Sequence, residues 1–89
     1  MNVEYLPSFL KDLKALKSTP VFEAIRSLVF EAIPQSTSLE EISRLKKLKG
    51  FDDAYRIRVG DYRVGLFITE ETITFARALH RKEIYRYFP

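Results

Sequence analysis

Cysteine is absent from the 89-residue sequence, and histidine occurs only once. A disulfide framework and a thiolate metal site are therefore excluded, and a metal site built on histidine is disfavoured. The sequence also contains no Walker loop for nucleotide phosphates and no nucleophile elbow. These absences favour a protein that functions without a metal ion or another cofactor.

Long apolar runs are absent as well. No stretch approaches the roughly 20 apolar residues that span a bilayer, and the first residues, MNVEYLPSF, lack the basic and then apolar pattern of a secretory signal peptide. We therefore expect a cytoplasmic protein that does not contact a membrane. Hydrophobic residues make up 46% of the chain and aromatic residues 13%, which is enough for one core, so residues 1–89 are predicted to form a single domain.

The net charge of +3 is distributed unevenly along the chain. Through Ser43 there are four basic and six acidic residues, whereas from Arg44 onward there are eleven basic and six acidic ones. A basic surface attracts polyanions and binds nucleic acid with salt-sensitive affinity. A solvated lysine-rich face would give the same composition, so the positions of the basic residues decide between the two interpretations.

The N-terminal half has the apolar spacing of two helices. Residues 1–5 are predicted to form a first strand, and residues 7–17 a helix with apolar side chains at steps of three and four. A second helix is predicted over residues 20–33, with Thr19 as its N-cap and Pro34 as its end.

A polar connection follows the second helix. Ser38 and Glu41 have the spacing of a capping box, which predicts a short helical turn. Residues 44–50 contain four basic side chains and are predicted to form a basic loop.

In the C-terminal half, apolar residues alternate with polar ones. Residues 55–59 and 62–68 flank a Gly-Asp turn and predict a β-hairpin, and residues 72–79 predict a third strand. Residues 80–87 are too few for more than a strand extension or a helical turn. The order β-α-α-β-β-β with a short C-terminal tail predicts an α+β fold. Its two N-terminal helices pack on one face of a small, mostly antiparallel sheet and leave the other face free for function.

The predicted hairpin presents arginines on that free face. If the apolar residues of its first strand pack under the helices, Arg56 and Arg58 project from the other side, about 6.6 Å apart, and Arg63 can face the same way. A single exposed arginine would carry little information, because edge strands use charge to prevent aggregation. Three arginines on adjacent strands, followed by His80 and Arg81, favour a functional surface, because guanidinium groups bind phosphate in a bidentate manner.

Three runs of the C-terminal half carry a resemblance to a known family: residues 48–50, residues 55–64 and residues 78–86. They resemble the RelE/ParE superfamily of toxins, and its RelE-like members most, and the two-helix start fits that family too. The resemblance implies a toxin of a type II toxin-antitoxin pair that enters the ribosomal A site and cuts mRNA. The implied partners are a cognate antitoxin that silences the toxin, the ribosome and mRNA.

The resemblance also implies the site residues. The family's basic positions on the hairpin and the last strand, its C-terminal tyrosine and its basic loop fall on Arg56, Arg58, Arg63, Arg81, Tyr85, Lys47 and Lys49. The best-known ribosome-dependent members have lysines where this chain has Arg56 and Arg58. Because arginine stays protonated at physiological pH, neither residue can act as a general base.

The implied chemistry is a metal-free cut in which the 2′-hydroxyl of the RNA attacks the neighbouring phosphorus. The products are a cyclic phosphate and a free 5′-hydroxyl. Arg56, Arg63 and Arg81 are the candidates for stabilising charge on the phosphoryl oxygens, whereas Lys47, Lys49 and Arg58 are expected to bind RNA. His80 is the first candidate for proton transfer, because histidine is the one side-chain type here that titrates near neutral pH. Tyr85 is a second candidate if neighbouring arginines favour its ionised form. A surface histidine and a core tyrosine are the structural alternatives.

Two other functions remain open. A ParE-like toxin that inhibits DNA gyrase without catalysis of its own would explain the lack of a good general base, and the arginines would then be surface charge. An inactive family member that acts only as a binding partner would not affect growth when expressed alone. The concentration of arginines on one face favours mRNA cleavage over gyrase inhibition.

Overall fold

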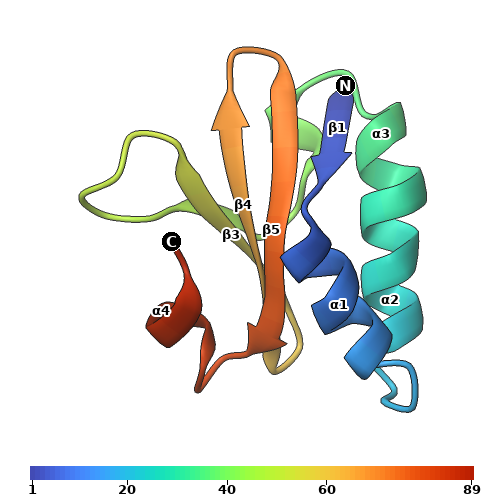
Figure 1. The fold of residues 1–89 in the computed structure, drawn as a ribbon. Coiled ribbons are helices and arrows are strands. Elements are labelled where there is room, and N and C mark those ends of the chain that lie inside the picture. Colours follow the sequence, from blue (N-terminus) through green and yellow to red (C-terminus); the bar gives the residue numbers. More distant parts are fainter.

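The computed structural model describes residues 1–89 and contains a five-stranded sheet with helices on both faces (Figure 1). The strand order is β1-β5-β4-β3-β2. β1 (Asn2–Tyr5) runs parallel to β5 (Thr72–His80), whereas β2 (Leu45–Lys47), β3 (Ala54–Val59), β4 (Tyr62–Thr69) and β5 form antiparallel pairs. The predicted α+β fold with a mostly antiparallel sheet is confirmed.

Strand β2 lies where the sequence predicts only a basic loop. Its residues Leu45, Lys46 and Lys47 pair with Ile57, Arg56 and Tyr55 of β3. Three residues are too few to show an alternating pattern, and the strand depends on β3 for its hydrogen bonds, so local sequence does not reveal it. The loop prediction is wrong for these residues, and the sheet gains a fifth strand.

Two helices cover one face of the sheet. α1 (Pro7–Ala15) is followed by a longer helix that begins as α2 (Phe22–Ser27), passes through the π-helical turn η1 (Leu28–Ala32) and ends as α3 (Ile33–Gln35). Figure 1 shows α2 and α3 as parts of one rod beside α1. No helix in the structure is both long and apolar enough to cross a membrane.

Both ends of the longer helix differ from the prediction. The Thr19 hydroxyl donates to the Leu16 carbonyl instead of capping the helix, which has Val21 as its N-cap. Pro34 does not end the helix, since the chain stays helical to Gln35. The π-helical turn before Pro34 changes the hydrogen-bond pattern so that the proline is accommodated.

The π-helical turn is stabilised from β1. Proline has no backbone N–H, so Pro34 cannot donate to the carbonyl five residues before it, which is that of Val29. The Tyr5 hydroxyl donates to this Val29 carbonyl at 2.6 Å. A side chain of the first strand therefore satisfies an acceptor that the proline leaves unpaired.

The predicted turn after the helix is a 3-10 helix, η2 (Leu39–Glu41). Ser38 makes no side-chain cap, so the capping-box prediction is wrong in its first residue. The Glu41 carboxylate instead accepts hydrogen bonds from the hydroxyl and the backbone N–H of Thr37, and these bonds lower the pKa of Glu41.

The main core fills the space between the two helices and the sheet. Phe9 of α1, Ile25 and Val29 of the longer helix, and Ile57 and Phe75 of the sheet are at most 1% exposed. Tyr55 and Val59 flank Ile57 and pack against the same core, as the alternation in β3 predicts. Burial of this apolar surface is the main force that holds the helices on the sheet.

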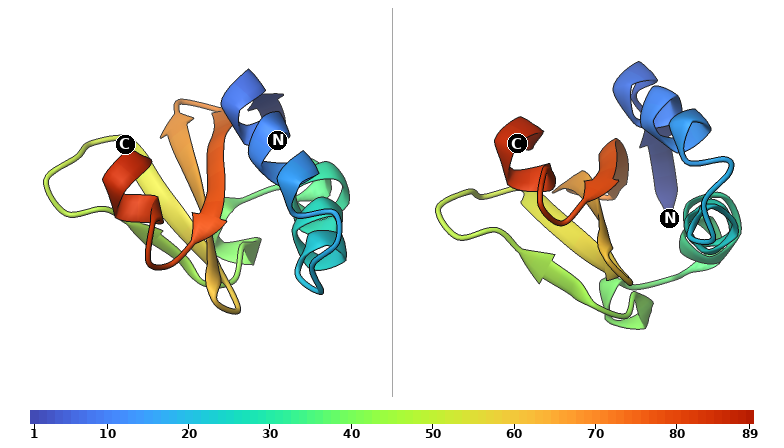
Figure 2. Two further views of the ribbon diagram at one scale, coloured as in Figure 1. Left: turned by 60° about the horizontal axis from the view of Figure 1, so that its bottom comes forward. Right: turned by 90° about the horizontal axis from the view of Figure 1, so that it is seen from below.

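A second, smaller core lies on the opposite face, which the sequence predicted to be free. There α4 (Ile84–Tyr87) and Phe88 pack against Ala54 and Ala76, and Figure 2 shows α4 on the other side of the sheet from α1 and α2. Gly65 makes this possible, because a Cβ atom at that position would lie 2.7 Å from the Phe88 ring. The C-terminal tail thus covers part of the outer face.

Candidate functional site

Four basic side chains share the outer face of β2, β3 and β4. Directly opposed residues of neighbouring strands lie on the same face. Arg56 is opposed to Lys46 on one side and to Gly65 on the other, and Arg58 is opposed to Arg63. We call the set Lys46, Arg56, Arg58 and Arg63 the arginine face. The structure thus brings together the three arginines that the alternation predicts, and adds Lys46.

Two of the arginines are oriented by backbone carbonyls. Nη1 of Arg56 donates to the carbonyl of Arg44 at 2.9 Å. Arg44 has φ of 63°, a left-handed conformation just before β2. Nη1 of Arg63 donates to the carbonyls of Gly60 and Tyr62 at 2.9 and 3.0 Å. A guanidinium group has five N–H donors, so each of these arginines keeps donors for an anion while its position is fixed.

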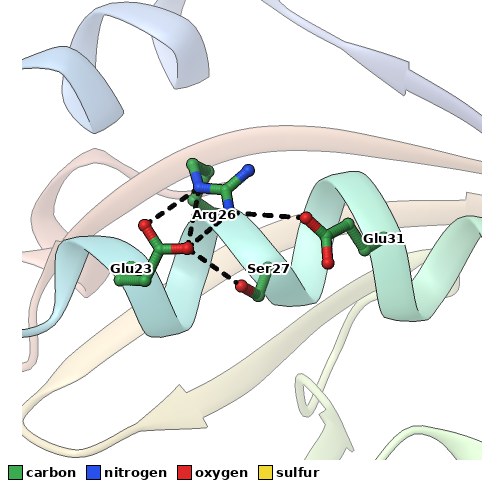
Figure 3. A network of polar contacts seen from close by, with 4 residues as sticks. All are labelled: Glu23, Arg26, Ser27 and Glu31. Carbon is green, nitrogen blue, oxygen red and sulfur yellow. Dashed lines mark hydrogen bonds and ion pairs between the residues drawn. The ribbon is translucent and has the colours of Figure 1, made fainter.

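No carboxylate neutralises the arginine face, since none lies within 4.0 Å of its four cations. Arg26 on the helical side is different, because it lies between Glu23 and Glu31 (Figure 3). Hydrogen bonding to Glu23 raises the pKa of Arg26 and lowers the pKa of Glu23. Unpaired cations close together repel one another, and a bound polyanion would relieve this repulsion.

The arginine face contains a shallow hollow. Its lining residues are Arg44, Leu45, Lys46, Arg56 and Arg58. Because cations surround the hollow and Arg56 is fixed at its wall, an anionic group such as a phosphate fits its chemistry.

Arg63 and Arg81 both form hydrogen bonds with the turn between β3 and β4. The Arg81 N–H donates to the Asp61 carbonyl at 2.8 Å, in the same turn whose Gly60 carbonyl holds Arg63. The Arg81 Nε and Asp61 Oδ1 atoms are 3.9 Å apart, and the two side chains are 57% and 72% exposed. An ion pair this long and this exposed is weak, so Arg81 remains available to another anion.

His80 lies on the helix-facing side of the sheet, apart from the arginine face. It is opposed to Tyr62, and their rings meet edge to face with centroids 5.3 Å apart. Its Nδ1 atom accepts a hydrogen bond from the Lys82 N–H at 3.1 Å. A register irregularity beside Gly65 and Leu66 leaves Ala76 unpaired, which reverses the faces for the rest of β5.

Tyr85 and Lys49 form a separate group on the outer side. With Leu48, Phe51, Phe88 and Pro89 they line a second hollow, and Tyr85 is 59% exposed. Lys47, the other predicted loop residue, is opposed to Tyr55 and so belongs to the helix-facing side. Its neighbour Lys46, which sequence reasoning missed, takes the position on the arginine face. The alternation along β2 would have identified it, had residues 45–47 been recognised as a strand.

Arg77 is a further arginine on β5, and its role is structural. The Asp12 carboxylate of α1 accepts from Arg77 Nε at 2.7 Å, from Arg77 Nη2 at 3.2 Å and from the Ala78 N–H at 3.0 Å. The hydrogen bonds from Arg77 to the Asp12 carboxylate raise the pKa of Arg77. The Arg77 guanidinium also lies 5.4 Å from the ring centroid of Tyr87, a cation–π contact. Arg77 therefore connects α1 to α4, which carries Tyr85.

No group of three His, Asp or Glu side chains in the structure lies close enough together to hold a metal ion. The side chains that the site offers are cations and phenol rings, whose chemistry is phosphate binding, charge stabilisation and proton transfer.

Comparisons with known proteins identify the family. Residues 3–85 match the family model described as the ParE toxin of type II toxin-antitoxin systems. The chain is 43% identical over 90 residues to Toxin RelE3 of Methanocaldococcus jannaschii, with 100% of both chains covered. It also matches a chain of the RelB-RelE antitoxin-toxin complex from Methanococcus jannaschii, with a TM-score of 0.78, 41% identity, and coverage of 97% of this chain and 99% of that one.

A more distant match supports the fold alone. A chain of the DinJ-YafQ complex from E. coli has a TM-score of 0.74 at 18% identity, with 94% of this chain and 97% of that chain covered. The family model matches nearly the whole chain, and the sequence identity to Toxin RelE3 over the full length is well above 30%. Both findings confirm the resemblance drawn from the three C-terminal runs. The chain therefore belongs to the RelE/ParE superfamily, as a RelE-family toxin of a type II toxin-antitoxin system.

Proposed function

We propose that this toxin is an endoribonuclease that cuts mRNA on the ribosome. The observation that carries the proposal is the arginine face, with four cations on one surface, no carboxylate within 4.0 Å and two guanidinium groups fixed by backbone carbonyls. Fixed cations stabilise the charge that develops on a phosphate in the transition state, and they need no reorganisation during the reaction. The 43% sequence identity to Toxin RelE3 over the whole chain supports the same function.

In the proposed reaction the 2′-oxygen of a ribose attacks the adjacent phosphorus as its proton leaves. The bond from phosphorus to the 5′-oxygen breaks, and that oxygen receives a proton, so a 2′,3′-cyclic phosphate and a 5′-hydroxyl result. Arg56, Arg63 and Arg81 stabilise the phosphoryl oxygens, and Arg58 binds a neighbouring phosphate. Loss of one such transition-state contact typically lowers the rate about 10²- to 10³-fold.

The exposure of the two side chains supports Tyr85 over His80 as the candidate for proton transfer. Tyr85 is largely exposed on the outer side. It belongs to α4, which Arg77 of β5 contacts through the Tyr87 ring. His80 packs on Tyr62 and uses Nδ1 to accept a backbone hydrogen bond. We therefore expect Tyr85→Phe to reduce cleavage more than His80→Gln. The ribosome would supply the orientation of the mRNA that this small site lacks.

We also propose that a cognate antitoxin binds the arginine face. In the solved RelB-RelE and DinJ-YafQ structures the similar chain occurs in a complex with an antitoxin. A segment that folds as it binds and contributes carboxylates would neutralise the four cations. Co-expression with the neighbouring gene should give a complex that survives size-exclusion chromatography, and separate elution of the two products would contradict this.

The function is tested by inducing the toxin in a bacterial host and mapping RNA ends together with ribosome positions. The expected result is growth arrest with new 5′-hydroxyl ends inside ribosome-bound codons, and no cleavage of the same mRNA without ribosomes. Single alanine variants should lose activity more at Arg63 and Arg56 than at Arg58, because a ground-state phosphate contact mainly affects occupancy. Growth arrest with intact mRNA would contradict the proposal.

Inhibition of DNA gyrase is the second candidate, favoured by the match to the ParE family model. It would require no general base, which agrees with the arginines at positions 56 and 58. A supercoiling assay with purified gyrase separates the two functions, since an endoribonuclease leaves supercoiling unchanged.

A further inference from the structure

Arg44, at the border of the arginine face, has a backbone conformation that arginine rarely adopts. Its φ of 63° lies in the left-handed region, where the Cβ atom of an L-residue crowds the following carbonyl oxygen. Glu70 is the one other non-glycine residue with a positive φ, at 50°. Glu70 lies in the two-residue turn between Thr69 and Thr72, and such tight hairpin turns require a positive φ. Arg44 lies in no hairpin, so its conformation needs another explanation.

The neighbours of Arg44 hold it in this conformation. Ile42, two residues before it, is buried in the main core, and Leu45, directly after it, packs against the same core. The chain is thus anchored on both sides of Arg44. Strained backbone conformations persist only where the surrounding structure determines them in this way, and they are concentrated at functional sites.

The carbonyl of Arg44 points at the arginine face. Nη1 of Arg56 donates to this carbonyl at 2.9 Å, and the backbone N–H of Arg58 donates to the same oxygen at 3.4 Å. Arg56 forms no ion pair, so the hydrogen bond to Arg44 is the contact that orients its guanidinium. If Arg44 were extended like a strand residue, the path of the chain from Ile42 to Leu45 would change, and the carbonyl would move with it.

The side chain of Arg44 contributes separately from its backbone. It is exposed, forms no ion pair, and lines the hollow together with Lys46, Arg56 and Arg58. Its positive charge adds to the attraction for a polyanion. The hydrogen bond to Arg56, by contrast, comes from the backbone. It therefore requires only that the residue at position 44 can adopt a positive φ.

We propose that Arg44 is a positioning residue, whose left-handed backbone holds the Arg56 guanidinium in the orientation that meets the phosphate during cleavage. The inference rests on the proposed function, in which Arg56 stabilises the phosphoryl oxygens, and adds to it the residue that orients Arg56. A cation that is already oriented stabilises the developing charge without reorganisation. A displacement of about 1 Å can lower the rate of a reaction about 10²-fold, so loss of this hydrogen bond should lower kcat.

The test compares two variants at position 44 that lose the same charge. Asparagine adopts a positive φ readily, whereas the β-branched valine does not. With ribosome-bound mRNA, both variants should raise KM to the same extent, because both remove one cation from the hollow. Only Arg44→Val should also lower kcat, by about 10- to 100-fold. In an Arg56→Ala background Arg44→Val should have no further effect on kcat, because the group that it misplaces is gone.

A second measurement does not depend on cleavage. The ¹⁵N relaxation of the Arg56 Nε–H group reports how firmly the guanidinium is held. The group should be ordered in the parent and in Arg44→Asn, and mobile in Arg44→Val. The control is Glu70→Val, which puts the same strain into the turn between β4 and β5 and should change neither kcat nor the mobility of Arg56. Thermal melts give the temperature below which every variant is folded and can be compared.

The outcomes are distinct for the positioning role and for the proposed function. If Arg44→Asn and Arg44→Val have the same kcat, or if Arg56 is equally ordered in both, the positioning role is wrong. If Glu70→Val lowers kcat as much as Arg44→Val does, the effect is a general loss of stability and the positioning role is again wrong. If the parent cleaves no RNA while Arg56 becomes mobile only in Arg44→Val, the proposed function fails and the positioning of Arg56 by Arg44 stands.

Discussion

Gly65 shows how one residue places the C-terminal tail on the sheet. It lies in the middle of β4, where a glycine lowers strand stability, yet it provides the space into which the Phe88 ring packs. With Ala54 and Ala76 it makes a flat surface on the outer face. Sequence alternation predicts that Gly65 points outward, but it does not predict which ring covers it, because that contact joins residues far apart in the chain.

We expect Gly65→Ala to destabilise the protein by about 1 to 3 kcal/mol, the usual cost of an overpacked core. The new Cβ atom would meet the Phe88 ring at 2.7 Å. Urea denaturation measures the change in the free energy of unfolding. In a Phe88→Ala background the cost of Gly65→Ala should largely disappear, since the clashing ring is gone. An equal cost in both backgrounds would contradict the proposed contact.

The unpaired residue Ala76 decides on which face of the sheet His80 lies. Uninterrupted alternation from Ile73 along β5 would point His80 outward with the arginines. The unpaired Ala76 shifts the register, so Leu79 faces outward and His80 packs on Tyr62. The segment TITFARAL gives one indication of this bulge. Uninterrupted alternation would turn Arg77 toward the core, whereas the bulge turns it to the outer face.

Among the elements, α1 is connected to α4 through the end of β5. Beyond its pairing with β1, β5 has an open edge, and α1 side chains satisfy its backbone. The Ser8 hydroxyl donates to the Ala76 carbonyl at 2.7 Å, and Asp12 accepts the Ala78 N–H. Arg77 then extends the connection from Asp12 to Tyr87. These side chains protect the edge from pairing with another strand.

We expect Asp12→Asn to destabilise the protein by about 1.5 to 3 kcal/mol, the range for hydrogen bonds to a charged group. The side chains of Arg77 and Asp12 are 26% and 11% exposed, so water screens this pair only partly. A double-mutant cycle with Arg77→Met, followed by urea denaturation, measures the coupling. Additive effects of the two substitutions would show that the pair contributes no stability. Lys14→Gln, an exposed change on the same helix, is the control.

The ion pair between Glu23 and Arg26 should stabilise the protein at neutral pH and lose this effect in acid. Because its folded pKa is lowered, Glu23 stabilises the protein above its unfolded pKa of about 4.3, and this contribution is lost as the pH falls through the lower folded value. Glu23→Gln should therefore lower the melting temperature slightly at neutral pH and not at all near pH 2. Glu40→Gln, at a glutamate without an ion pair, should show no such difference. If Glu23→Gln still melted below the parent near pH 2, the attribution of the effect to the Glu23 carboxylate would be contradicted.

The elements themselves were predictable to different degrees. The two helices and the hairpin follow from local periodicity, and their apolar faces bury as expected at Phe9, Ile25 and Ile57. Strand β2 was not predicted, and helix α4 was predicted only as one of two alternatives, because each is three or four residues long and forms only against a distant partner. The π-helical turn before Pro34 was missed for a similar reason, since the compensating donor is Tyr5 of β1.

At the scale of the whole molecule, the arginines differ by face in whether they form ion pairs. On the helical side Arg26 is paired with glutamates, and Arg77 at the sheet edge is paired with Asp12, whereas the arginine face has no carboxylate partner. The sequence predicted three members of this face from the alternation in the hairpin. It did not predict that the tail would lie beside it, or that Lys46 rather than Lys47 would belong to it. This cluster of four unpaired cations on one face is the feature on which the proposal of RNA cleavage rests.

The most direct test of that derivation compares two triple variants with the same loss of charge. One replaces Arg56, Arg58 and Arg63 by alanine, and the other replaces Lys11, Lys14 and Lys17, which are exposed on and just after α1. Arg58 and the three lysines are exposed, and Arg56 and Arg63 are half-buried outside both cores. Surface substitutions away from a core seldom change stability by more than about 0.5 kcal/mol each, so both variants should melt close to the parent. We predict that the arginine variant no longer cleaves ribosome-bound mRNA or arrests growth, whereas the lysine variant does both. Parental cleavage by a folded arginine variant would contradict the assignment of the arginine face as the active surface.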